Sequence, residues 1–140
     1  MTCDRGSAVW LESMTAHEAA LGALKQYFGY DSFRPGQQGI VDALLDGRDV
    51  LGVMPTGAGK SVCYQIPAAL MPGVTIVISP LISLMRDQVD ALNDLGLPAA
   101  FVNTTQTADE QAMVFAQAAA GQPKLLYVAP ERLETGRFRD

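Results

Sequence analysis

The pattern of hydrophobic and polar positions predicts a chain that alternates between buried strands and helices. The clearest strand is GVTIVIS (73–79), which is continuously apolar and rich in β-branched residues, as expected for a strand buried on both faces. KLLYVAP (124–130) has the same character, and PAAFVN (98–103) is a weaker strand. A further short apolar run, DVLGVM (49–54), precedes a glycine-rich loop, and we expect it to be a strand as well.

Segments with helical spacing of their apolar residues precede and separate these strands. The predicted helices are residues 15–28, 36–46, 61–71, 81–96 and 107–121. Two of them begin with the spacing of a capping box, Thr15 with Glu18 and Thr107 with Glu110. Pro67 is expected to kink its helix or to end it early, because proline lacks the N–H that the helical ladder needs.

Strands and helices therefore alternate four times, with short connections. This order is typical of an α/β fold in which helices flank a parallel sheet. The length suits a single domain over residues 14–140, preceded by a loose leader at residues 1–13.

Composition narrows the class of protein. With 49% hydrophobic and 18% charged residues the chain is globular, and no apolar run approaches the roughly 20 residues that span a bilayer. The N-terminal residues contain no apolar core of a signal peptide, so we expect none. Cys3 and Cys63 form neither a metal spacing nor a disulfide framework, which favours a reducing cytosol.

The formal net charge of −5 argues mildly against a bulk electrostatic grip on nucleic acid. It leaves open binding through backbone amides and helix N-termini, which a count of charges does not register.

The stretch MPTGAGKS (54–61) carries the chemistry of a phosphate-binding loop. Glycine backbones and a helix N-terminus present amides to an anion, Lys60 reaches the β- and γ-phosphates, and Ser61 holds Mg²⁺. Met54 stands where the general pattern G-x-x-x-x-G-K-[ST] has its first glycine. The alternative is a strand-to-helix turn that is glycine-rich for steric reasons only.

Five segments together resemble the RecQ family of superfamily 2 DNA helicases over about residues 20–133. PTGAGKS, preceded by Met54, resembles motif I of superfamily 2, and CYQIPA (63–68) resembles its RecQ-type continuation. FGYDSFRPGQ (28–37) resembles motif 0, SPLISLMRDQV (79–89) resembles motif Ia, and LLYVAPERL (125–133) resembles the segment before the Walker B strand. The resemblance implies a RecA-like P-loop NTPase lobe and ATP- and Mg²⁺-dependent 3′-to-5′ DNA unwinding. It also implies a role in DNA repair and recombination in the cytoplasm, at the nucleoid if the protein is bacterial.

The same resemblance assigns the nucleotide site residue by residue. Tyr30 would stack on adenine, with Arg34 and Gln37 contacting the base and the Gln37 amide reading its edge. The residues that would cradle the phosphates are Pro55, Thr56, Gly57, Ala58, Gly59, Lys60 and Ser61. The alternatives are core packing for Tyr30 and Phe33 and a solvated surface position for Gln37.

A second set of residues would contact the phosphates of single-stranded or partly duplex DNA. These candidates are Ser79, Pro80, Arg86, Gln88, Asn103 and Thr104. Arg86 together with Asp87 and Asp90 is equally compatible with a solvated charged face. Asn103 and Thr104 are equally compatible with an N-cap cluster for the helix at 107–120. Pro130 and Glu131 occupy a position that resembles motif Ib.

ATP hydrolysis also needs an acidic Walker B residue, and translocation needs a second RecA-like lobe. The sequence reaches Asp140 without a DEAH-type motif, so we expect a truncated first lobe that binds nucleotide without hydrolysing it. Two alternatives stay open: another P-loop enzyme such as a small nucleotide kinase, or a non-catalytic module that binds nucleotide or DNA.

Overall fold

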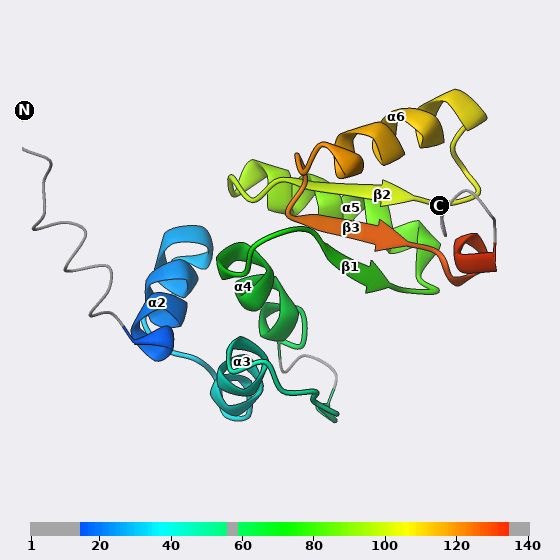
Figure 1. The fold of residues 1–140 in the computed structure, drawn as a ribbon. Helices are drawn as coiled ribbons and strands as arrows, with labels where there is room; N and C mark the ends of the chain where they lie inside the picture. The colour runs from blue at the N-terminus through cyan, green and yellow to red at the C-terminus, as the bar shows by residue number, and fades with distance from the viewer. Residues whose placement is uncertain (1–14, 56–58, 135–140) are drawn as a thin grey trace, which may run out of the picture. The chain divides into compact units, whose positions relative to one another are not determined.

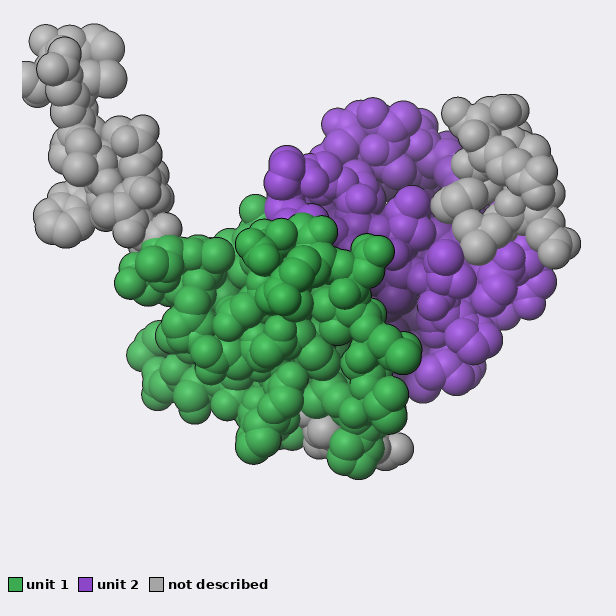
Figure 2. All heavy atoms as spheres, turned by 60° about the horizontal axis from the view of Figure 1, so that its bottom comes forward, with its two compact units in different colours: residues 1–70 green, residues 71–140 purple. Residues whose placement is uncertain are grey.

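The computed structural model describes residues 15–55 and 59–134, which fall into two compact units. Unit 1 comprises residues 1–70 and unit 2 comprises residues 71–140 (Figure 2). Within the described residues, unit 1 is helical and unit 2 holds the strands (Figure 1). The expected leader, residues 1–13, lies outside the described residues. No described helix is both long and apolar enough to cross a membrane.

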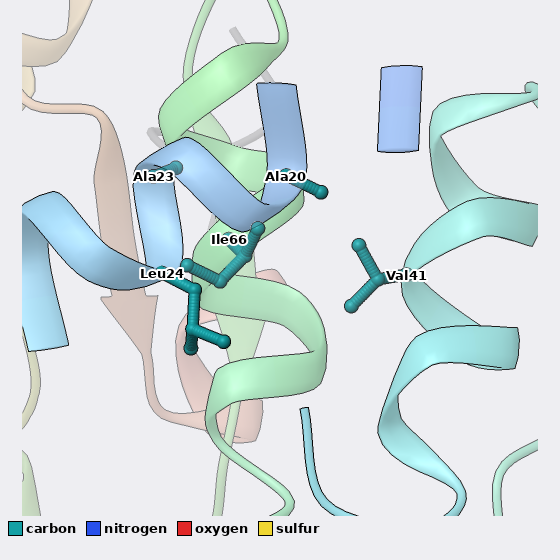
Figure 3. Close-up of a cluster of buried hydrophobic side chains, with 5 residues drawn as sticks. All are labelled: Ala20, Ala23, Leu24, Val41 and Ile66. Carbon is teal, nitrogen blue, oxygen red and sulfur yellow. The ribbon is translucent and has the colours of Figure 1, made fainter. Parts of the chain in front are cut away.

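Short helical segments make up unit 1. They are α2 (Ala16–Ala23), the π-helical turn η1 (Leu24–Phe28), α3 (Gln37–Leu45) and α4 (Val62–Leu70). The Thr15 hydroxyl caps α2 by accepting the Glu18 N–H at 3.1 Å. The apolar faces meet in one buried cluster (Figure 3), which consists of Ala20, Ala23, Leu24, Val41 and Ile66. Burial of this apolar surface is the main force that holds the short helices together.

Pro67 does not end α4, which excludes one of the two outcomes expected from the sequence, an early end of the helix. The helix continues past it to Leu70, and Ile66, Pro67 and Ala68 are all buried. The packing of these three neighbours offsets the backbone hydrogen bond that proline cannot make.

The apolar run at residues 49–54 is not a strand, which corrects the sequence prediction. Residues 49–55 have no regular secondary structure, and Leu51 and Val53 are 93% and 89% exposed. A strand needs a neighbour to receive its backbone hydrogen bonds. The described part of unit 1 contains only helical elements and offers no such neighbour.

Three strands in the described part of unit 2 form one parallel sheet in the order β1-β3-β2. They are β1 (Thr75–Ile78), β2 (Ala99–Val102) and β3 (Leu125–Val128), each within a predicted strand. Helices α5 (Ile82–Asp94) and α6 (Ala108–Ala119) connect them, and the 3₁₀ turn η2 (Pro130–Glu134) follows β3. Figure 1 shows the three arrows pointing the same way. The predicted α/β class with a parallel sheet and flanking helices is therefore confirmed.

The position of each strand in the sheet decides its burial. The central strand β3 is buried at every residue, and Val102, Leu126 and Val128 form a cluster against side chains of α6. On the edge strand β1, Ile76 and Ile78 are 50% and 54% exposed, so the prediction that this strand is buried on both faces is wrong. Among the described residues β1 has a neighbouring strand on one side only, and the helix that covers β2 and β3 on this face leaves the isoleucines of β1 exposed.

The capping box of α6 gives a test of this description. Thr107 accepts the Glu110 N–H at 3.2 Å, and Glu110 accepts the Thr107 N–H at 3.1 Å. We expect Thr107→Ala to lower the free energy of unfolding by about 1 kcal/mol, because helix donors lose their partner. The control is Thr104→Ala, at an exposed threonine outside any helix, with an expected change within about 0.5 kcal/mol. Urea denaturation measures both, and equal effects would contradict the assignment of the cap.

Candidate functional site

The predicted phosphate loop leads directly into α4. Gly59 has a φ of 77°, in the left-handed region that favours glycine. Lys60 is exposed and its carbonyl accepts the Cys63 N–H at 3.1 Å, while the Ser61 carbonyl accepts the Gln65 N–H at 3.0 Å. The helical hydrogen bonding thus begins at Lys60, and the first N–H groups of such a helix are left for an anion. Thr56, Gly57 and Ala58 lie outside the described residues, and Pro55 is exposed.

Met54 has a packing role at the position where the general loop pattern has glycine. Its side chain is half-buried, and its sulfur accepts a hydrogen bond from the Cys63 thiol at 3.7 Å. A Cβ built on Gly36 would lie 3.8 Å from the Met54 methyl group. Met54 therefore joins the start of the loop to α4 and to the residue that precedes α3.

A small pocket in unit 1 brings together the predicted base-binding residues and the phosphate loop. Its volume is about 130 Å³, and its lining consists of Tyr30, Ser32, Arg34, Gln37, Gly59 and Val62. Sites for whole drug-sized ligands usually measure about 300–1,000 Å³, so this pocket suits one end of a nucleotide. Ser32 and Val62 were missed by the sequence reasoning, although both are close in the chain to residues that it singled out.

The two aromatic residues before α3 have different environments. Phe33 packs against the buried cluster of unit 1, as the core-packing alternative proposes. Tyr30 is 53% exposed and lines the pocket, so core packing does not explain it. An exposed aromatic face at the mouth of a pocket is able to stack on a base.

Gln37 connects the two halves of this site. Its side chain is only 3% exposed, which excludes the alternative of a solvated surface position. Its Oε1 accepts the Arg34 N–H at 2.8 Å, and its Nε2 donates to the Gly59 carbonyl at 2.9 Å. The amide therefore bonds to the segment before α3 at one end and to the phosphate loop at the other.

The carboxyl ends of the three strands gather most of the predicted DNA-contacting residues in unit 2. Ser79 and Pro80 follow β1, Asn103 and Thr104 follow β2, and Pro130 follows β3. The parallel register continues beyond the strands, since the Ser79 N–H donates to Val128 and the Ala129 N–H donates to Val102, both at 3.1 Å. This edge is where open α/β sheets usually bind ligands.

Asn103 differs from the other candidates at this edge, because it is only 2% exposed. Its Oδ1 accepts both the N–H and the hydroxyl of Thr105, and Gln111 donates to its backbone carbonyl at 2.9 Å. Buried amides are usually satisfied by such bonds. Asn103 thus holds the loop after β2, while Thr104 beside it is exposed.

The remaining DNA candidates lie on or before α5. The Ser79 hydroxyl accepts the Leu81 N–H at 3.2 Å, which shapes the turn into the helix. The Arg86 guanidinium lies 5.9 Å from the centre of the Phe101 ring, and Gln88 is half-buried. Arg86 also lines a hollow of about 380 Å³ together with Asp109 and Glu110. These carboxylates oppose an approaching phosphate, so the alternative of a solvated charged face for Arg86 stays open.

The candidate metal ligand from the sequence, Ser61, lies apart from any cluster of acidic, histidine or cysteine residues in the described ranges, 15–55 and 59–134. They contain no group of three or more His, Cys, Asp or Glu residues that could hold a metal ion. The half-buried Ser61 at the start of the helical bonding offers one oxygen ligand. Mg²⁺ commonly combines few protein oxygens with substrate phosphates and waters, so Ser61 fits a magnesium ion that arrives with a nucleotide.

Comparison with known proteins finds similarity to helicases, the group of enzymes that the sequence motifs resemble. The sequence pattern of the family described as DEAD/DEAH box helicase matches residues 34–139. The chain is 52% identical over 128 residues to the ATP-dependent DNA helicase RecQ of Haemophilus influenzae and 48% identical over 120 residues to that of Bacillus subtilis. It is 47% identical over 108 residues to the RecQ-like DNA helicase BLM of Xenopus laevis.

The matched regions differ in how much of each protein they cover. The alignments cover 91%, 85% and 76% of this chain but 21%, 20% and 8% of those relatives, in the same order. The chain thus spans about a fifth of the length of the two bacterial proteins. A crystal structure of a hypothetical ATP-dependent RNA helicase from Sulfolobus tokodaii aligns with a TM-score of 0.64 at 22% identity. That alignment covers 83% of this chain and 34% of the other, and it supports the RecA-like fold alone.

Cys63, beside the phosphate loop, gives a prediction on pH. Burial raises the pKa of its thiol above the ordinary value of 9.0. The folded state therefore holds the proton more tightly, and the resulting stability is present below the unfolded pKa and lost as pH rises through the folded pKa. In a Cys3→Ser background, we expect the free energy of unfolding to fall above about pH 9. The further substitution Cys63→Ala should remove the part of this decrease that is due to the thiol. Identical pH profiles of unfolding free energy for the two proteins would contradict the prediction.

Proposed function

Because this chain belongs to the DEAD/DEAH box helicase family, we propose that the protein is an ATP-dependent 3′-to-5′ DNA helicase of the RecQ type. The observation that carries the proposal is the pocket in which Tyr30, Arg34 and Gln37 meet Gly59 of the phosphate loop. Base recognition and phosphate binding are thereby joined in one site. This proposal includes a role in DNA repair or recombination and a location with the DNA, at the nucleoid in a bacterium.

The base of ATP would enter the pocket beside Tyr30. The exposed ring of Tyr30 offers a stacking surface for adenine, and the Arg34 side chain lies at the same pocket. Stacking alone accepts any base, so selectivity needs a group that both donates and accepts hydrogen bonds, such as the Gln37 amide.

The phosphates would lie at the start of α4. Gly59 leaves room for the backbone to approach, Lys60 supplies the positive charge, and the helix N-terminus supplies N–H donors. Pro55, Thr56, Gly57 and Ala58 complete this loop in the proposal. Ser61 would share Mg²⁺ with the phosphates, and the ion would neutralise charge that develops on them during hydrolysis.

The carboxyl edge of the unit 2 sheet would contact the backbone of single-stranded DNA. Ser79, Pro80 and Thr104 lie at this edge, with Arg86 and Gln88 on the adjoining helix α5. Because the net charge is −5, we expect hydrogen bonds from amides and hydroxyls to matter more here than a basic surface. Asn103 would act indirectly, by holding the loop that presents Thr104.

Hydrolysis and movement need groups beyond those described above. The residues that directly follow β1, β2 and β3 are Ser79, Asn103 and Ala129, and none of these is the carboxylate that activates Mg²⁺. We therefore propose that the described residues bind ATP and contact DNA without hydrolysing ATP. A Walker B carboxylate and a second RecA-like lobe would supply hydrolysis and translocation.

Lys60 provides the direct test of nucleotide binding. Mg-ATP should raise the thermal midpoint of this chain, since a ligand that binds only the folded state stabilises it. Lys60→Ala should weaken ATP binding at least about tenfold, because a charge-assisted contact is worth more than 1.4 kcal/mol. Lys124→Ala removes the same charge from unit 2 and should leave the ATP effect unchanged. An ATP-induced rise that is equal in Lys60→Ala and wild type would refute the proposal.

Tyr30 tests whether the pocket holds the base. We expect Tyr30→Ala to weaken ATP binding by about 1–3 kcal/mol, the usual value of aromatic stacking on a base. Binding of inorganic tripolyphosphate, which has no base, should be unaffected. Phe28→Leu is a control at an aromatic residue packed on the unit 1 core and should weaken neither ligand. Titration calorimetry measures all four affinities, and a Tyr30→Ala variant with wild-type ATP affinity would exclude stacking.

A further inference from the structure

We propose that Gln37 is a positioning residue for the phosphate loop, in addition to any contact that its amide makes with a base. This role rests on the proposed function, because it assigns a further task within the same nucleotide site. The supporting contact is the hydrogen bond from Gln37 Nε2 to the Gly59 carbonyl, at 2.9 Å. It joins two residues that are 22 positions apart in the chain.

Gln37 itself is held in place and so is able to act as a fixed support. The Arg34 N–H donates to its Oε1 at 2.8 Å, and the Gln37 backbone N–H donates to the Arg34 carbonyl at 3.1 Å. The residue is the first of α3 and is only 3% exposed. A side chain anchored at both its backbone and its amide oxygen has little freedom to change its position.

The bond to Gly59 determines which way the next amide points. The Gly59 carbonyl and the Lys60 N–H belong to one planar peptide group, and no cis peptide bond is present in the described residues. In a trans peptide the C=O and N–H point in opposite directions. When Gln37 holds the Gly59 carbonyl, it therefore turns the Lys60 N–H away from itself, at the helix N-terminus that would receive a phosphate.

Close packing at Gly59 supports the same role. Gly59 has a positive φ of 77°, and a Cβ built on it would collide with Gln37 Nε2. The amide thus lies directly against the backbone that it supports, and only glycine leaves room for both the backbone conformation and the hydrogen bond.

The two possible roles of Gln37 predict different effects on two ligands. A residue that only reads the base affects ATP and not inorganic tripolyphosphate. A residue that positions the loop affects both ligands by similar factors. Gln37→Met removes the amide at similar length and without new charge, and Gln38→Met makes the same change at the exposed neighbouring glutamine.

The experiment measures the affinity of this chain for Mg-ATP by calorimetry and for tripolyphosphate by displacement of a fluorescent ATP analogue. We expect Gln37→Met to weaken both about tenfold, because no amide is left to hold the Gly59 carbonyl. Gln38→Met should match wild type. Loss of ATP affinity with unchanged tripolyphosphate affinity would overturn the positioning role and leave base reading, and so would a wild-type chain that binds ATP but not tripolyphosphate. A wild-type chain that binds neither ligand would overturn the proposed function itself.

A second variant covers the case in which Gln37→Met does not fold. Gln37→Glu keeps an acceptor for the Arg34 N–H but places an oxygen against the Gly59 carbonyl, so the bond to the loop is lost and repulsion replaces it. It should also weaken tripolyphosphate binding about tenfold or more. Gln38→Glu controls for the added charge, and equal tripolyphosphate affinity in the two glutamate variants would count against the proposal.

Discussion

The proposed nucleotide site depends on a single backbone turn, the left-handed residue Gly59 between the predicted phosphate loop and α4. The turn starts the helix at Lys60 and brings the loop backbone against Gln37. Through Gln37 the same turn is tied to the segment that carries Arg34, and Tyr30 lines the pocket that results. The residues proposed to recognise the base and those proposed to bind the phosphates thus belong to one hydrogen-bonded assembly within unit 1.

Unit 2 presents its candidate groups by a different principle. Parallel pairing places the carboxyl ends of three strands at one edge, so residues far apart in the sequence become neighbours without any special contact. The polar side chains at this edge differ in their environment. Asn103 turns inward and fixes its loop, whereas Thr104 remains outside. A cluster of polar residues in the sequence therefore contains both structural and surface members, and burial distinguishes them.

Much of the fold could be predicted from the sequence, and the predictions that were wrong share a common cause. The apolar runs around Ile78, Val102 and Val128 indicate strands on their own, and capping residues such as Thr107 mark helix starts through local chemistry. The prediction of a strand at residues 49–54 was wrong because a strand needs a partner strand, which the local pattern of residues does not reveal. The prediction that Ile76 is buried was wrong for a related reason, since the sequence of one strand does not reveal the order of strands in the sheet. At the site, residue types indicated a base and a phosphate, but the bond between Gln37 and Gly59 is a long-range contact that only the structure shows.

The strand order also constrains when unit 2 can form. β3 lies between β1 and β2 although it is the last of the three in the chain, and its Leu125 pairs with Thr75 of β1 and with Ala99 of β2. During synthesis on the ribosome, β1 and β2 therefore have no partner among the described strands until residues 125–128 emerge. Because the central strand comes last, the sheet forms only through contacts between segments far apart in the sequence, and such non-local contacts usually form slowly.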